Sequence, residues 1–333
     1  MIRLSIIVPA YNVADWIERC IRSLEDQDIP KSEYEIIVTN DGSPDRCKEI
    51  IENLQKEFSN LILINQENQG VSVARNNAIA RAKGEYIMPV DPDDYVLPNS
   101  FQHILLKAKH KELDVLYLGF EIFDSEGKSC WKTSYKELED LVHNGVDGYF
   151  APRGYDVRDP DRSWGILFKK QLLYKYEIFY PKDVPYLEDG LFLGKVFSVA
   201  TRVGFDNDIF YKRTIRKGSA TNSGLFFSEE AMQGFLKAVR DIKEFGSQHQ
   251  LEKERMHLIN HVVAKFVLLT LTPNMGAFKF RKYFRVITLL KRENLGSLKT
   301  EGLRFSYKSC SHVFNFSKLI LPFYFWFSNK VKQ

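Results

Sequence analysis

The chain has few cysteines, and they show no metal-binding pattern. The four cysteines are far apart in 333 residues and form no Cys-x-x-Cys pair: Cys20, Cys47, Cys130 and Cys310. This spacing excludes a small disulfide-stapled fold and predicts reduced thiols. We assign none of the seven histidines to a metal.

Long apolar runs are also missing. The run Leu319–Phe327 has nine residues and a central Pro322, so it is too short to span a bilayer. At the start of the chain, Met1-Ile2-Arg3 leads directly into the strand-like run Leu4–Val8, with no small-residue cleavage site after it. We therefore expect no secretory signal and a cytoplasmic location.

Charge of both signs is abundant but unevenly distributed. Charged residues make up 27% and apolar residues 44% of the sequence, which is typical of a globular protein. The formal net charge is +4, yet residues 276–333 contain twelve Lys and Arg against only Glu293 and Glu301. An acidic body therefore precedes a basic, aromatic-rich tail, and we expect this tail to face an anionic partner.

The first two thirds of the chain alternate between short apolar runs and segments with helical periodicity. Strands are predicted at residues 4–10, 34–39, 61–64, 86–90, 114–123, 164–168 and 203–211. A helix over 71–82 is expected to end at Gly84, whereas residues 125–163 predict loop and edge structure. Short connections between strand and helix predict a parallel, doubly wound α/β sheet.

Polar residues follow three of these strands at the point where each ends. They are Tyr11-Asn12, Asn40-Asp41 and the cluster Asp91 to Asp94. Ligands bind beyond the carboxyl ends of the strands in such sheets, so we expect these residues to share one site. Asp91 and Asp93 can point the same way from an extended backbone, and two carboxylates beside open coordination positions suit Mg²⁺ or Mn²⁺. The alternative is a turn in which an Asp caps the following helix.

Five motifs together resemble the inverting glycosyltransferases of family 2, which have the GT-A nucleotide-sugar fold. They are Ser5-Ile6-Ile7-Val8-Pro9-Ala10-Tyr11-Asn12, Asn40-Asp41-Gly42-Ser43-Pro44-Asp45, Asn68-Gln69-Gly70-Val71-Ser72-Val73-Ala74-Arg75-Asn76, Gly84-Glu85-Tyr86-Ile87 with Asp91-Pro92-Asp93-Asp94, and Glu188-Asp189-Gly190-Leu191-Phe192. Each motif is weak alone, but five in this order are specific. The resemblance implies a Rossmann-like, doubly wound mixed sheet over residues 1–225, and it leaves residues 226–333 as a helical C-terminal extension.

The resemblance also implies a reaction, the transfer of a hexose from a UDP-sugar to a hydroxyl with inversion at the anomeric carbon. Asp93, with help from Asp91, would hold Mg²⁺ or Mn²⁺ and so stabilise the charge that develops on the diphosphate. The resemblance places these residues against the nucleotide and sugar: Pro9, Tyr11, Asn12, Asp41, Arg75 and Asp91. Asp41 would accept a hydrogen bond from the uracil ring N–H.

Inversion in one step requires a general base on the face opposite the leaving group. Asp189 stands at the start of a predicted helix and fits this role, with Glu188 as its neighbour or as a ligand of the acceptor. The alternative is a carboxylate that only stabilises the helix N-terminus through the helix dipole. The donor motifs favour the base.

The C-terminal region, residues 226–333, which contains this tail, is helical by pattern and lies outside the resemblance. Its basic and aromatic residues suit either the surface of an anionic membrane or contact with a second copy in a homo-oligomer. We favour the membrane, on the cytoplasmic face of the inner membrane, with a glycan or a lipid-linked glycan of a surface polysaccharide as the acceptor. The tail shows no recognisable nucleic-acid-binding module, so we expect no nucleic-acid partner.

Two other functions compete with this one. A nucleotidyltransferase shares the sheet and the acidic cluster but normally needs a Gly-rich, basic phosphate loop where Pro9-Ala10-Tyr11-Asn12 stands. A non-catalytic scaffold that binds nucleotide sugars would not need Asp189. The presence of all the expected carboxylates favours the enzyme.

Overall fold

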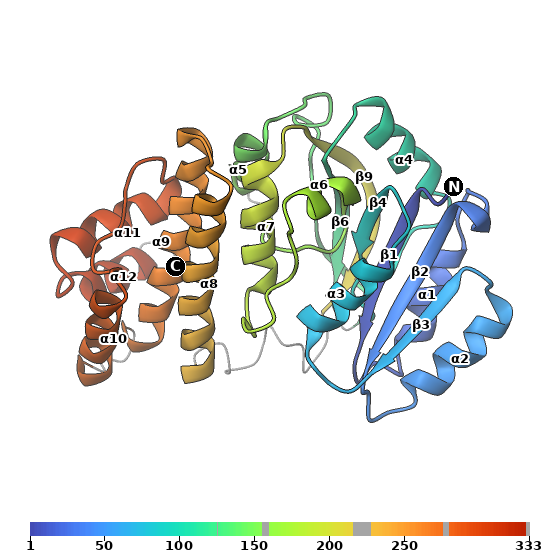
Figure 1. Cartoon of the computed structure of the whole chain (residues 1–333), viewed down its shortest axis with the longest axis horizontal. Helices are drawn as coiled ribbons and strands as arrows, with labels where there is room; N and C mark the ends of the chain where they lie inside the picture. The colour runs from blue at the N-terminus through green and yellow to red at the C-terminus, as the bar shows by residue number, and fades with distance from the viewer. Residues whose placement is uncertain (125, 155–159, 216–227, 276–279, 331–333) are drawn as a thin grey trace. The chain divides into compact units, whose positions relative to one another are not determined.

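The structure is a computed structural model that describes residues 1–124, 126–154, 160–215, 228–275 and 280–330 (Figure 1). It divides into two compact units, which we describe separately. The first comprises residues 1–182 and 188–222, and the second comprises residues 183–187 and 223–333. The predicted domain boundary at residue 225 lies outside the described residues.

The first unit alternates strands and helices over most of its length. Its strands are β1 (Leu4–Ala10), β2 (Tyr34–Asp41), β3 (Leu61–Gln66), β4 (Tyr86–Pro89), β5 (Tyr95–Val96), β6 (Val115–Phe123), β7 (Ser129–Lys132), β8 (Ile166–Lys169) and β9 (Val203–Thr214). Its α-helices are α1 (Ile17–Glu25), α2 (Cys47–Glu57), α3 (Val71–Arg81), α4 (Phe101–His110), α5 (Gly145–Gly154), α6 (Lys170–Lys175) and α7 (Glu188–Val199).

The strands form one mixed sheet. Within the described part of the chain it has nine strands in the order β3-β2-β1-β4-β8-β6-β9-β5, with β7 paired to β6. The strands β1 to β4 are parallel, and β6 and β9 are also parallel. The sheet is mixed because β8 runs antiparallel to both of its neighbours, β4 and β6. The predicted doubly wound mixed sheet is therefore confirmed.

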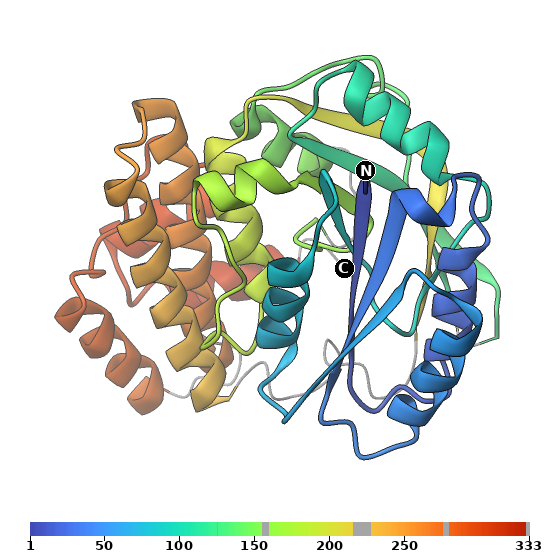
Figure 2. The ribbon, with the colours of Figure 1, turned by 45° about the vertical axis from the view of Figure 1, so that its right-hand side comes forward.

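The direction of winding reverses between β1 and β4. The chain passes through α1 and α2 as it moves outward from β1 to β3, and it returns through α3 to β4 on the other side of β1. As right-handed crossovers require, α1 and α2 lie on one face of the sheet, and α3, α6 and α7 lie on the other (Figures 1 and 2). Such a reversal opens a crevice beyond the carboxyl ends of β1 and β4, where ligands bind in α/β sheets.

Buried strands form the centre of the core. Every residue of β1 and of β2 is buried, which explains why apolar residues make up most of β1 and the centre of β2. The helices cover them with one apolar stripe each; in α1 this stripe includes Ile17, Cys20, Ile21 and Leu24. All four cysteines are free thiols, as predicted.

Two local predictions were wrong, and close packing explains both. Helix α3 ends at Arg81 with Ala82 as its C-cap, so Gly84 does not terminate it. Gly84 instead lies against β1, where an added Cβ would come 2.5 Å from the backbone nitrogen of Ser5. Residues predicted as loop form α5, in which Gly145 and Gly148 leave no room for a Cβ against their neighbours. Glycine has a low helix propensity, so these two glycines weaken the sequence signal for a helix in this segment.

The second unit is helical. Its helices are α8 (Glu229–Gln248), α9 (Lys253–Met275), α10 (Phe280–Arg292), α11 (Phe305–Phe316) and α12 (Leu321–Lys330). Ser228 caps α8, because its hydroxyl accepts a hydrogen bond from the Ala231 backbone N–H at 3.1 Å. Over the described residues, we find no helix whose length and apolar character would let it cross a bilayer.

Candidate active site

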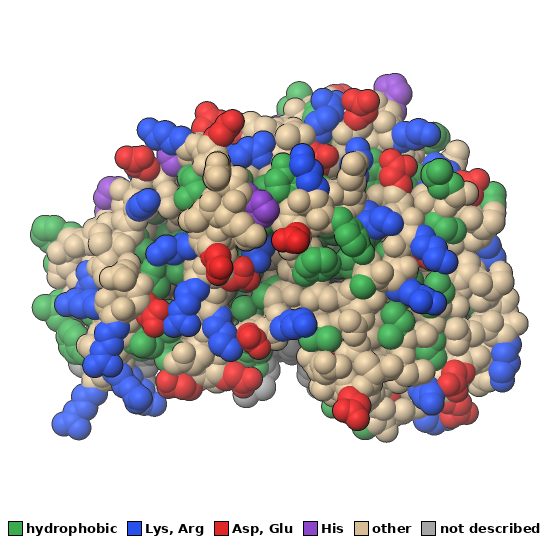
Figure 3. Space-filling model, in the orientation of Figure 1, with side chains coloured by type: hydrophobic (Ala, Val, Ile, Leu, Met, Phe, Trp, Pro, Cys, Tyr) green, Lys and Arg blue, Asp and Glu red, His purple; other side chains and the backbone are tan. Residues whose placement is uncertain are grey.

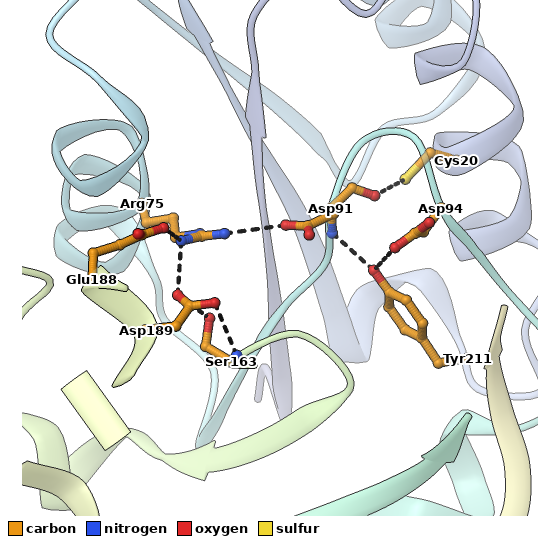
Figure 4. Close-up of polar contacts among 8 residues, drawn as sticks. All are labelled: Cys20, Arg75, Asp91, Asp94, Ser163, Glu188, Asp189 and Tyr211. Atoms are coloured by element: carbon orange, nitrogen blue, oxygen red, sulfur yellow. Dashed lines mark hydrogen bonds and ion pairs between the residues drawn. The ribbon is translucent and has the colours of Figure 1, made fainter. Parts of the chain in front are cut away.

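Three aspartates follow β4 and form a carboxylate cluster. Oxygen atoms from Asp91, Asp93 and Asp94 all lie within 4.8 Å of one another. Asp94 is 3% exposed; it accepts hydrogen bonds from the Tyr211 hydroxyl at 2.8 Å and the Thr214 N–H at 3.0 Å, both on β9. Figure 4 shows the Tyr211 hydroxyl between Asp94 and the backbone of Asp91. Because β9 occupies Asp94 in this way, Asp91 and Asp93 are the cluster members suited to bind a ligand.

The cluster has the chemistry of a divalent-cation site. Burial raises the pKa of Asp91 to about 6, with Asp93 adding to the shift and Arg75 opposing it. Burial and the two neighbouring carboxylates also raise the pKa of Asp94 well above its usual range. A bound cation would stabilise the ionised form of such closely spaced carboxylates. An all-oxygen donor set suits Mg²⁺ or Mn²⁺.

The loops after β1 and β2 are tied together beside this cluster. Pro9 is buried at the end of β1, and Tyr11 is half exposed. Asn12 has a left-handed backbone with φ of 55°, and its N–H donates to Ser43 Oγ at 2.7 Å. Ser43 in turn donates to Asp45 at 2.6 Å. Tyr11 thus projects from a braced turn.

Asp41 organises the start of α3. Its carboxylate accepts hydrogen bonds from the side chain of Gln66 at 2.7 Å, the N–H of Gln69 at 2.8 Å and the N–H of Gly70 at 2.9 Å. Gly70 needs its positive φ of 87° to turn the chain into the helix. A carboxylate offers about four acceptor positions, so one remains for a ligand. The contact of Asp41 with uracil remains a prediction.

Arg75 connects the aspartate cluster to the start of α7. Its Nη2 donates to Asp91 at 3.1 Å, and its Nη1 donates to Asp189 at 3.0 Å and to Glu188 at 3.1 Å (Figure 4). Burial by itself lowers the pKa of Arg75, but the carboxylates around it raise that pKa well above its usual range. The structure therefore brings three predicted site residues, Asp91, Arg75 and Asp189, into one hydrogen-bonded group.

Glu188 and Asp189 have different surroundings although they are adjacent. Asp189 accepts from the N–H of Ser163 at 3.1 Å and from its hydroxyl at 2.9 Å, in addition to Arg75. For Glu188, the structure gives the bond to Arg75 as its side-chain contact. Burial and the charge of Asp189 raise the pKa of Glu188 to about 7, and Arg75 opposes this. The pair thus combines a firmly held carboxylate with one that titrates near neutrality.

The sequence did not reveal Ser163, Tyr180 or Tyr211, which hold the site together. Tyr211 binds the aspartate loop twice, since its hydroxyl also accepts from the Asp91 N–H at 3.0 Å. Tyr180 lies under Arg75, with its ring centroid 5.0 Å from the guanidinium carbon. Neither has a local signal, because each tyrosine contacts residues about a hundred positions away in the chain.

A second cluster contains a histidine and two aspartates. The Nε2 of His103 lies 2.8 Å from Asp206 and 3.9 Å from Asp208. The ammonium of Lys107 lies 3.0 Å from the same oxygen of Asp206. An ion pair with a lysine explains this cluster, so we assign it no metal.

Comparison with known proteins gives consistent matches. Residues 5–168 match the family model described as Glycosyl transferase family 2. The chain is 34% identical over 200 residues to the uncharacterized glycosyltransferase EpsJ of Bacillus subtilis, covering 60% of this chain and 57% of that protein. It is 28% identical over 253 residues to the poly(ribitol-phosphate) beta-glucosyltransferase of Bacillus spizizenii, covering 73% and 38%. The chain thus spans less than two thirds of the length of each of these relatives.

A solved structure has the same fold. Residues 1–349 of TarS from Staphylococcus aureus, in complex with UDP-GlcNAc, match with a TM-score of 0.72 and 21% identity. The match covers 96% of this chain and 89% of that one. At this identity the likeness shows the fold alone, and it confirms the predicted GT-A architecture.

Proposed function

We propose that this chain, which belongs to glycosyl transferase family 2 and is a glycosyltransferase, moves a sugar from a UDP-sugar to a hydroxyl with inversion at the anomeric carbon. The observation that supports this most is the hydrogen-bonded group around Arg75. It joins Asp91, which follows β4, to Asp189 at the start of α7. A donor site and a proton acceptor thus lie within the span of one side chain, as a one-step displacement requires.

The matched family and the relatives are glycosyltransferases, which argues against a non-catalytic scaffold and against a nucleotidyltransferase. The turn after β1 also lacks a Gly-rich phosphate loop. The exposed ring of Tyr11 and the remaining acceptor position of Asp41 are suited to hold a uracil, beside Pro9 and Asn12. UDP-GlcNAc in the S. aureus structure supports a uridine nucleotide for this chain.

Asp93 and Asp91 would hold the divalent cation, which neutralises charge on the leaving diphosphate when it is bound. Asp189 performs the proton transfer. Its Oδ2 takes the proton of the acceptor hydroxyl while that oxygen forms a bond to the anomeric carbon, and the bond from this carbon to the UDP oxygen breaks on the opposite face. The donors on Asp189 keep it in the orientation that this transfer needs.

The acceptor we propose is a glycan or lipid-linked glycan in surface polysaccharide biosynthesis. The Bacillus spizizenii relative is named for poly(ribitol-phosphate), which supports a polymeric acceptor rich in hydroxyls. An acceptor of this kind at the cytoplasmic face of the membrane also fits the chemistry of the second unit.

The second unit has an apolar tip where α11 meets α12. The tip is formed by Phe316, Leu319, Ile320 and Phe323, whose side chains are 85%, 60%, 47% and 46% exposed. The Tyr283 hydroxyl donates to the Lys318 carbonyl at 2.6 Å and so holds α10 beside the tip. We infer a peripheral contact with lipid, since exposed apolar groups of this size mark interaction surfaces.

Basic side chains are exposed on α10, beside the apolar tip. On α10, Arg281, Lys282 and Arg285 are exposed beside the half-exposed ring of Phe284. Figure 3 shows Lys and Arg gathered on the helical unit where Figure 1 labels α10. The combination suits anionic lipid headgroups above an acyl-chain boundary. Charge complementarity therefore favours a membrane over a second copy of this equally basic surface.

Titration calorimetry of UDP tests the donor site. We expect wild type to bind UDP at least about tenfold more tightly with Mn²⁺ than without it, because Asp91 and Asp93 would hold the cation and its charge would offset that of the diphosphate. Asp93→Ala should lose this metal-dependent gain. Asp208→Ala removes a highly exposed aspartate of the second cluster and should behave as wild type. If wild type binds no UDP, either with or without Mn²⁺, the proposed donor site is refuted.

A further inference from the structure

Arg75 is the buried link between the two halves of the proposed site. It lies on α3 and is 4% exposed. Its Nη2 reaches the metal side at Asp91, and its Nη1 reaches Glu188 and Asp189 (Figure 4). One rigid guanidinium therefore sets the separation between a proposed metal ligand and the proposed base.

The guanidinium is itself held in place. The Tyr180 ring under it stacks on Phe192 of α7, with centroids 4.1 Å apart and planes within 3°. Asn76, the next residue on α3, exchanges two hydrogen bonds of 2.8 Å with the backbone of Tyr180. Because α3 and α7 grip Tyr180 from both sides, Arg75 has a fixed platform.

The nitrogens of Arg75 are not open to a nucleotide. Both Nη atoms bind carboxylates at 3.0 to 3.1 Å. Its Nε is buried and has no hydrogen-bond partner among the described residues. A nucleotide contact would require at least one of these bonds to break inside a buried group. This arrangement differs from the nucleotide-pocket role that the family resemblance implies for Arg75.

The contacts on Asp189 are those that a general base needs. Its Oδ1 accepts from Arg75 and from the Ser163 hydroxyl, and its Oδ2 accepts from the Ser163 N–H. Three donors fix the carboxylate plane, and one lone pair of Oδ2 stays available for a proton. Without Arg75, only Ser163 would orient the carboxylate, which would lie close to two other carboxylates.

We propose that Arg75 is a positioning residue that aligns Asp189 with the donor site and makes no contact with the nucleotide. This inference rests on the proposed function, because it assigns Asp189 as the base. Arginine suits the task because its planar fork reaches carboxylates on two sides at once. A lysine ammonium is a point charge on a flexible stem and can satisfy only one side well.

The test measures UDP binding and turnover in parallel for Arg75→Met and Arg75→Lys. Binding is measured by calorimetry with UDP and Mn²⁺. Turnover is measured as UDP release with water as acceptor, using whichever of UDP-glucose, UDP-galactose and UDP-N-acetylglucosamine wild type cleaves fastest. Arg81→Met, an exposed arginine on the same helix, is the matched control. Arg75→Lys retains a buried charge, so it keeps the test valid if the methionine variant does not fold.

We expect both Arg75 variants to bind UDP within about threefold of wild type and to keep the donor KM. Their kcat should fall by about a hundredfold in Arg75→Met, with partial rescue in Arg75→Lys, since misplacing a reacting group by about 1 Å costs this much. A tenfold loss of UDP affinity in both variants would assign Arg75 to the nucleotide pocket and overturn the proposal. Unchanged kcat would overturn it as well. If wild type itself binds no UDP, the proposed function fails first, and this inference fails with it.

Discussion

At the scale of single residues, the site contains more negative charge than its arginine balances. Asp91, Glu188 and Asp189 share one guanidinium. Burial raises the pKa of Glu188 to about 7 and that of Asp91 to about 6, so protonation of this group changes near neutral pH. A site that exchanges a proton in this range is suited to general-base chemistry.

The raised pKa of Glu188 predicts a stability difference that depends on pH. In the folded state this carboxyl holds its proton up to about pH 7, whereas its unfolded value is 4.5. The folded state therefore binds more protons between these values, and the free energy of unfolding falls as pH rises through them. Glu188→Gln removes this titration. Urea unfolding should therefore give the variant a higher free energy of unfolding, relative to wild type, at pH 8 than at pH 5. The expected difference is on the order of 2 kcal/mol.

The matched control is Glu126→Gln, which changes an exposed glutamate in the same unit. Its stability relative to wild type should be the same at both pH values. Equal pH dependence for Glu188→Gln and the control would mean that Glu188 titrates like a solvated glutamate.

At the scale of elements, the aspartate loop after β4 depends on contacts with β9, which lies between β6 and β5 in the sheet. Tyr211 on β9 accepts from the N–H of Asp91 and donates to the carboxylate of Asp94. Its ring is fully buried and stacks on Trp164, with ring centroids 4.6 Å apart. The strand thus holds in place the loop that carries Asp91 and Asp93.

Tyr211→Phe should therefore loosen the loop while keeping the packing of the ring. It leaves buried Asp94 with one donor fewer, and we expect a loss of about 1–3 kcal/mol in the free energy of unfolding. The metal-dependent part of UDP binding should weaken as well. Tyr117→Phe is the control, because this tyrosine is equally buried and its hydroxyl has no hydrogen-bond partner in the part of the chain that the structure describes. Equal effects of the two substitutions on UDP binding would contradict a specific role for Tyr211.

Local pattern placed the acidic side chains but not their partners. Asp41 ends the buried strand β2, Asp91 and Asp93 follow β4, and Asp189 lies in the first turn of α7, close to where periodicity placed them. Their contacts depend on long-range packing: Arg75 is 114 residues from Asp189, and Tyr211 is 117 residues from Asp94. Such pairings have no short-range sequence signal. Helix α5 was missed for a related reason, since Gly145 and Gly148 serve close packing that is invisible before the fold is known.

At the scale of the whole molecule, the second unit differs from the first in its net charge, which is positive. From residue 276 onward the chain has twelve basic residues and two acidic ones, and one of these, Glu293, pairs with Arg240. A solvated surface gains little from uncompensated charge of one sign, which repels itself. An anionic surface would neutralise it, and headgroup attraction adds about 1 kcal/mol for each basic residue close to the membrane.

Vesicle flotation tests this contact. Wild type should float with vesicles containing phosphatidylglycerol and stay behind with phosphatidylcholine alone, and the bound fraction should fall as salt screens the charges. Combining Phe316→Ser with Leu319→Ser should lower partitioning about tenfold or more, because each side chain loses apolar area that lipid would bury. Leu106→Ser, which changes a 51% exposed leucine on α4, should float as wild type does. Wild type that stays soluble with anionic vesicles, but forms dimers that the paired substitutions dissolve, would assign the apolar tip to a second copy of the chain.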